Sequence, residues 1–179
     1  YLAGNATLAT GVVVGTFLAA MGLGAWLTEF LAVSTTPRPA LLRCLVIVEL
    51  SLCPLCLLGP LVLFQLFAID GPLWLAVVVL TILVGVLGGM ELPLITRLLE
   101  TQQQLRQVLV RVLALDYFGS LLGALAFPLL LLPTLGLLPT AAALALVPIG
   151  CACWLSWAFD DLRRWRRGIL LAIPLVAVG

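Results

Sequence analysis

The feature of this sequence that most limits its fold is a series of long apolar runs. An α-helix needs about 20 consecutive apolar residues to cross ~30 Å of hydrocarbon. The runs cover residues 7–31, 41–67, 73–96, 108–132 and 139–159, and a sixth begins at residue 168 and is cut at residue 179. None of them alternates between apolar and polar residues as the strands of a membrane barrel do. We therefore predict an all-α, polytopic transmembrane helical bundle of about six spans, the last truncated, forming one domain over residues 1–179.

The composition supports a membrane protein and excludes several kinds of chemistry. Hydrophobic residues make up 64% of the chain and charged residues 9%, against about 25% charged in soluble domains. All nine basic residues are Arg, so His-ligated haem or zinc, a Ser-His-Asp triad and lysine Schiff bases are excluded. The net charge of +1 argues against nucleic acid as a partner. We expect no cofactor and no metal.

The arginines predict an orientation, because basic residues are retained on the cytoplasmic side of a membrane. Every arginine lies in or beside the first, third or fifth loop between the runs: Arg38, Arg43, Arg97, Arg106, Arg111, Arg163, Arg164, Arg166 and Arg167. We expect these loops to be cytoplasmic and residue 1 to be outside, in a multi-pass protein of a bacterial inner membrane. Because Tyr1 is not Met and no signal peptide is visible, a further span is expected before it.

Three of the runs carry a carboxylate at a similar depth. Glu49, Glu91 and Asp116 each lie roughly 8–12 Å in from the arginine-rich side, at ~1.5 Å per residue. A charged side chain inside a membrane is costly unless it is paired, protonated or hydrated. One interpretation is a cation or proton site open to the cytoplasm. The other is a set of buried ion pairs that fix the packing, with Arg43, Arg97 and Arg111 as the expected partners.

Neighbouring residues bear on both interpretations. Pro93 follows Glu91 closely and removes the amide partner of the backbone carbonyl of residue 89, which slightly favours a binding site. Glycines at helical spacing predict faces on which helices approach closely in lipid. These predicted packing positions are Gly11, Gly15, Gly22, Gly85, Gly88, Gly119 and Gly123. The glycine faces would turn the carboxylates into the bundle.

The cysteines suggest a different chemistry. Cys53 and Cys56 form a CxxC pair within one apolar run, a spacing that thiol-transferring proteins use. The alternative is that both thiols pack as small apolar side chains, as we expect for Cys44, Cys151 and Cys153. No spacing suits a zinc or iron–sulfur site.

Several stretches resemble the membrane helices of spermidine-synthase-like proteins (polyamine aminopropyltransferases). They are Gly4-Asn-Ala, the segment 17–27, Glu91-Leu-Pro-Leu-Ile-Thr-Arg97, the segment 112–123 with its Leu-Asp-Tyr-Phe-Gly-Ser core, Phe127-Pro-Leu, and Pro133-Thr-Leu-Gly-Leu. The matched motif positions include Glu91, Pro93, Arg97, Asp116, Tyr117, Gly119 and Gly123. The resemblance covers about residues 1–140.

The resemblance implies that enzymes of this family carry a soluble domain that transfers an aminopropyl group from decarboxylated S-adenosylmethionine to putrescine. No Gly-rich loop or catalytic acid pair of that domain is present here, so we expect no activity from this chain alone, although a longer parent could be such an enzyme. Three hypotheses follow: a membrane domain whose acidic residues bind or pass a polyamine or other cation, a structural subunit of a larger complex or homo-oligomer, and a thiol-redox protein using Cys53 and Cys56.

Overall fold

The described part of the chain is entirely helical. The computed structural model describes residues 6–31, 36–100 and 105–159. Within these ranges the elements are α1 (Ala6–Leu31), α2 (Arg38–Ala68), α3 (Leu73–Glu100), α4 (Leu105–Ala126), the π-helical segment η2 (Phe127–Leu131), α5 (Leu132–Leu135) and α6 (Leu137–Ala158). The all-α prediction is therefore confirmed for the described residues.

Among the described residues, five helical stretches are long and apolar enough to cross a membrane, judged by length and composition. They are Ala6–Leu31, Arg38–Ala68, Leu73–Leu99, Arg106–Leu135 and Leu137–Ala158. Each contains most of one of the five complete runs predicted from the sequence. The predicted sixth span, 168–179, lies outside the described residues.

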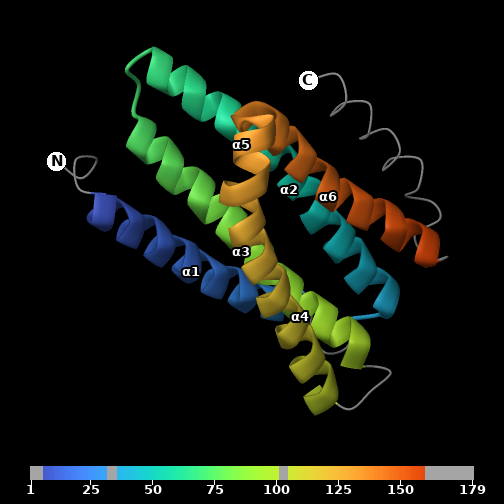
Figure 1. The fold of residues 1–179 in the computed structure, drawn as a ribbon. Coiled ribbons are helices and arrows are strands. Elements are labelled where there is room, and N and C mark those ends of the chain that lie inside the picture. The colour runs from blue at the N-terminus through green and yellow to red at the C-terminus, as the bar shows by residue number, and fades with distance from the viewer. Residues whose placement is uncertain (1–5, 32–35, 101–104, 160–179) are drawn as a thin grey trace.

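The helices pack side by side in the order α1, α3, α2, α6. α1 runs along α3, while α2 packs against α3 on one side and α6 on the other (Figure 1). The main cluster of buried apolar side chains joins α2, α3 and α6 through residues such as Leu42, Val46, Leu94 and Ala152. α3 is therefore the element against which both halves of the bundle are built.

Proline and glycine account for where the helices begin. Pro37 has the extended backbone of an N-cap residue (φ −67°, ψ 145°), and proline in the first turn suits the start of α2 because the first amides have no helical partner anyway. Between α2 and α3, Asp70 adopts a positive φ of 50°, and the Gly71 amide donates to the Leu66 carbonyl at 2.8 Å. This turn reverses the chain and makes α2 and α3 antiparallel neighbours.

The long helix that begins at α4 changes its winding at Pro128. Proline has no amide hydrogen for the Ala124 carbonyl and crowds the preceding turn. The chain forms a π turn here, and the Leu132 amide donates to the Phe127 carbonyl. Gly136, with a φ of 81°, then ends α5 and reverses the chain into α6. The buried Thr140 hydroxyl donates to the Leu131 carbonyl at 3.1 Å and so fastens α6 to this region.

α4 is the least covered helix of the bundle. It crosses α3 at an angle (Figure 1) and meets the other described helices mainly through α3. Val108 is buried, but most of the large apolar side chains further along α4 are exposed, among them Leu115, Phe118 and Leu121. The described fold therefore leaves most of an apolar helix without protein neighbours.

Candidate functional site

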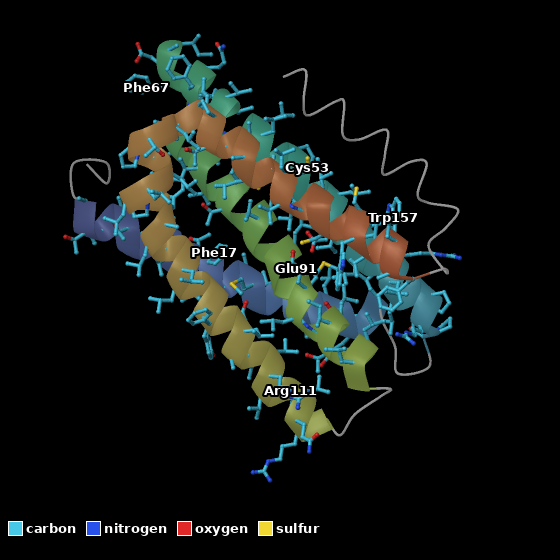
Figure 2. The ribbon with its side chains drawn as sticks, turned by 45° about the vertical axis from the view of Figure 1, so that its right-hand side comes forward. Phe17, Cys53, Phe67, Glu91, Arg111 and Trp157 are labelled. Atoms are coloured by element: carbon cyan, nitrogen blue, oxygen red, sulfur yellow. The ribbon has the colours of Figure 1, made fainter. Side chains whose placement is uncertain are left out.

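The three carboxylates singled out in the sequence come from three different helices, and Glu91 on α3 is the one that lies near both of the others. Glu49 lies on α2, Glu91 on α3 and Asp116 on α4. Glu49 and Glu91 are half-buried, whereas Asp116 is exposed. Glu91 lies within electrostatic range of both other carboxylates, and Figure 2 shows it on the central part of α3. We call these three residues the acidic cluster.

The predicted ion pairs are not formed. Among the residues that the structure describes, no arginine is joined to a carboxylate in an ion pair, and the Nη1 atom of Arg97 is buried without a hydrogen-bond partner. Helix geometry explains this. Side chains three or four residues apart share a helix face, but Arg97 lies six residues after Glu91 and Arg43 six before Glu49.

Arg111 is not placed to pair with Asp116 either. It precedes Asp116 by five residues, which turns the two side chains roughly 140° apart around α4, at about 100° per residue. Figure 2 shows Arg111 toward the beginning of α4, away from Glu91. The acidic cluster is therefore left without a bound counter-ion from the described arginines.

Close contact between α1 and α3 positions Glu91. A Cβ added at Gly89 would collide with the Met21 backbone, and one at Gly24 with the Val86 carbonyl. At Gly85 an added Cβ would lie 2.7 Å from the Ala20 Cβ. Only glycine at these positions lets the two backbones approach this closely.

Apart from Gly85, the glycines predicted as packing positions do not lie at a close contact between described helices. An added Cβ would meet no described atom within 4 Å at Gly11, Gly15, Gly22, Gly88, Gly119 or Gly123. Gly24 and Gly89 were not among the predicted positions. On α1 the face that carries the predicted glycines, such as Gly22, is nearly opposite to the face of Gly24. Residues 22 and 24 are about 200° apart around a helix.

A proline near Glu91 leaves a backbone acceptor at this level. Pro93 lies inside α3 and has no amide hydrogen to offer the Gly89 carbonyl. One turn further on, the Thr96 hydroxyl donates to the Leu92 carbonyl at 2.8 Å. The Leu92 carbonyl is therefore occupied, and the Gly89 carbonyl is the backbone acceptor that Pro93 leaves available near Glu91.

The cysteines lie beside the acidic cluster on the α2–α6 side. Cys53 is buried against Ala145 and Ile149 of α6, with Cys56 and Cys153 packed around them. All five cysteines are free thiols. Cys151, predicted only as a packing residue, lies within electrostatic range of Glu49 and Glu91. Helical spacing on α6 alone carries no signal for this proximity, because it depends on how α6 packs on α2.

Metal binding finds no ligand set here. Within the described ranges, no group of three or more His, Cys, Asp or Glu side chains is arranged to hold a metal ion. The negative charge of the acidic cluster can still attract a cation electrostatically.

Comparison with known proteins gives a consistent relationship. The chain is 30% identical over 178 residues to a protein named polyamine aminopropyltransferase from Leptospira interrogans, covering 99% of this chain and 34% of that protein. It is 37% identical over 161 residues to polyamine aminopropyltransferase 2 of Ralstonia nicotianae, covering 89% of this chain and 31% of that one. For polyamine aminopropyltransferase 1 of Streptomyces coelicolor, the identity is 36% over 152 residues, covering 82% and 27%.

The matches cover most of this chain, but the chain spans only about a third of the length of these relatives. No family model matches the sequence. No solved structure matches it either. Over most of its length the chain is nevertheless a homologue of proteins named polyamine aminopropyltransferase, and it belongs to a spermidine-synthase-like family.

Proposed function

We propose that this chain is the membrane-embedded helical domain of a spermidine-synthase-like protein, and that its acidic cluster binds a polyamine or another organic cation. The names of its relatives supply the substrate class, since each is called a polyamine aminopropyltransferase. The five apolar helical stretches support insertion in a membrane. Aminopropyl transfer itself is not assigned to these residues.

The observation that carries the proposal is that Glu91 lies within electrostatic range of two other carboxylates, with no paired arginine among the described residues. Like charges close together in a medium of low dielectric constant repel strongly, so such a cluster needs a compensating cation or protons. Polyamines carry several ammonium groups separated by short apolar chains. Carboxylates spread over three helices match that distribution of charge.

The distribution of the arginines indicates which side of the membrane the acidic cluster would face. Arg38 and Arg43 lie at the beginning of α2, Arg97 near the end of α3, and Arg106 and Arg111 at the beginning of α4. Antiparallel packing brings these helix ends to one side, which the retention of basic residues would make cytoplasmic. The acidic cluster would then be reached from the cytoplasmic side of the membrane.

The test is stabilisation of the purified chain by spermidine in detergent, at matched ionic strength. At a concentration of 100 Kd, a ligand that binds only the folded state adds about 2.7 kcal/mol of stability. For a chain of this size that raises Tm by roughly 5–10 °C. We expect this increase for the unmodified chain, and its loss in Glu91→Gln and in Asp116→Asn.

Glu29→Gln is the matched control, because Glu29 is an exposed carboxylate on α1 outside the acidic cluster. It should keep the full spermidine response. If Glu91→Gln and Asp116→Asn were both stabilised as much as the unmodified chain, the polyamine site would be refuted. Equal loss in the Glu29→Gln control would show general charge screening instead of a site.

A second candidate function is that of a subunit in a larger membrane assembly. The observation in its favour is α4, whose apolar surface is largely uncovered by the described residues. A co-purifying protein or a stable homo-oligomer that protects α4 from a lipid-soluble label would support this function. A monomer with α4 labelled along all its faces would contradict it.

A further inference from the structure

A cleft of about 570 Å³ opens between α1, α3 and α4, on the α4 side of the bundle. Its walls are mainly apolar and include Met21 and Gly22 of α1, Leu92 of α3, and Leu109 and Leu113 of α4. The cleft lies where α4 crosses α3 at an angle (Figure 1). Its size is in the range of sites that hold small organic ligands.

One charged side chain lines this cleft. Arg97 contributes to its wall from the last turns of α3, and its Nη1 atom is buried with no hydrogen-bond partner in the described part of the chain. A guanidinium stays protonated in proteins and has only donors to offer. A buried donor without an acceptor is costly, and more so when it is charged. The cleft therefore lacks an acceptor at the place where Arg97 is held.

The acidic cluster does not supply that acceptor. Glu91 is six residues from Arg97, on another side of α3, and Asp116 lies beyond Leu113 on α4, further from the arginine-bearing end. Neither is paired with Arg97. The Thr96 hydroxyl, also in the cleft wall, donates to the Leu92 carbonyl, and its oxygen does not accept from the Nη1 atom of Arg97. Within the described residues, the Nη1 atom of Arg97 therefore has no acceptor, and a ligand in the cleft would supply one.

We propose that this cleft binds an anionic lipid, whose phosphate or carboxylate headgroup accepts hydrogen bonds from Arg97 and whose acyl chain lies along the apolar walls of α1, α3 and α4. Planar guanidinium donors match both headgroups. An inorganic anion would meet the arginine but leave the apolar walls unfilled. A zwitterionic lipid would fill the walls but bring a cation next to Arg97.

The experiment measures lipid binding by native mass spectrometry of the chain in dodecyl maltoside. The probes are palmitoyl-oleoyl phosphatidylglycerol, phosphatidylcholine with the same acyl chains, oleate and inorganic phosphate. We expect tighter binding of phosphatidylglycerol than of phosphatidylcholine. Removal of one charge-assisted hydrogen bond in Arg97→Gln should weaken it by about tenfold to hundredfold. Arg43→Gln, which removes an exposed arginine outside the cleft, should leave it unchanged.

A second pair of variants keeps Arg97 and changes only the volume available to the acyl chain. An added Cβ at Gly22 or at Gly15 meets no described atom within 4 Å, so a side chain can be introduced at either position without a clash at its Cβ. Gly22 lines the cleft, whereas Gly15 does not. Gly22→Leu should displace the acyl chain and lose binding, while Gly15→Leu should bind as the unmodified chain does.

The outcomes separate the sources of the ligand. Oleate binding with the same dependence on Arg97 and Gly22 would support the site and select a carboxylate headgroup. If inorganic phosphate bound at the cleft as tightly as phosphatidylglycerol, the lipid proposal would be overturned and a simple anion site would remain. Unaltered phosphatidylglycerol binding in both Arg97→Gln and Gly22→Leu would overturn the cleft altogether. The spermidine response of the acidic cluster is read separately, so either proposal can fail alone.

Discussion

The contact between α1 and α3 makes a strong prediction about Gly24. A Cβ at this position would meet the Val86 carbonyl oxygen, and would lie only 2.9 Å from the Val86 carbonyl carbon. Carbon atoms pack best at about 3.5–4.0 Å, so Gly24→Ala forces the helices apart by roughly 1 Å or more. The obstacle is backbone, which cannot rotate away as a side chain can.

The magnitude follows from two opposing terms. Overpacking costs about 1–3 kcal/mol, and separating the backbones along the α1–α3 contact should reach the upper part of that range. Replacing a helical glycine by alanine returns up to about 1 kcal/mol of helix propensity. We expect Gly24→Ala to lower the free energy of unfolding by about 1–2 kcal/mol.

The assay is reversible unfolding in mixed dodecyl maltoside and SDS micelles, followed by tryptophan fluorescence. Gly22→Ala is the control on the same helix, because an added Cβ there meets no described atom within 4 Å. It should be neutral or stabilising by up to about 1 kcal/mol. If Gly24→Ala proved as stable as Gly22→Ala, the close approach of α1 and α3 would be wrong.

Two further predictions concern the ends of α6 and use the same unfolding assay. Thr140→Val removes the hydrogen bond to Leu131 and should cost about 0.6 kcal/mol, with an upper value near 1.7. Thr10→Val, which affects only an exposed hydrogen bond to Ala6 in its own helix, should cost less, and equal losses would speak against a tertiary role for Thr140. At the other end of α6, the Arg38 guanidinium lies 5.2 Å from the centre of the Phe159 ring. A double-mutant cycle with Arg38→Gln and Phe159→Leu should give a coupling of about 0.5–1 kcal/mol, and zero coupling would exclude the cation–π contact.

The helices could be predicted from the sequence, because each apolar run is long and prolines or glycines stand at several of its ends. What could not be predicted is how the helices face one another. On α1 the sequence offers glycines on more than one face, and spacing alone favoured the face of Gly22 over that of Gly24. Choosing between them requires the partner surface of α3, where Gly85 and Gly89 leave room.

The same limit applies to the candidate site. Depth along each run brought Glu49, Glu91 and Asp116 to one level, since depth needs only the rise per residue of a helix. Rotation around the helix decides ion pairing, and at five or six residues apart the expected arginines point elsewhere. The orphaned Nη1 atom of Arg97 was outside the reach of sequence reasoning, because its burial depends on α1 and α4 as well as on α3.

The π turn at Phe127–Leu131 has a consequence for how the chain tolerates changes in length. A π turn holds one more residue than an α turn over nearly the same rise, so it works as an insertion absorbed into the helix. Deleting one residue there would therefore restore regular winding with little rotation of the residues that follow, because four α-helical residues at about 100° each cover nearly the same angle as the π turn. Thr134 and Gly136 would keep their directions, and the turn into α6 would start from the same side. A single-residue deletion should accordingly be better tolerated within Phe127–Leu131 than in the regular part of α4, where it would rotate everything that follows by about 100°.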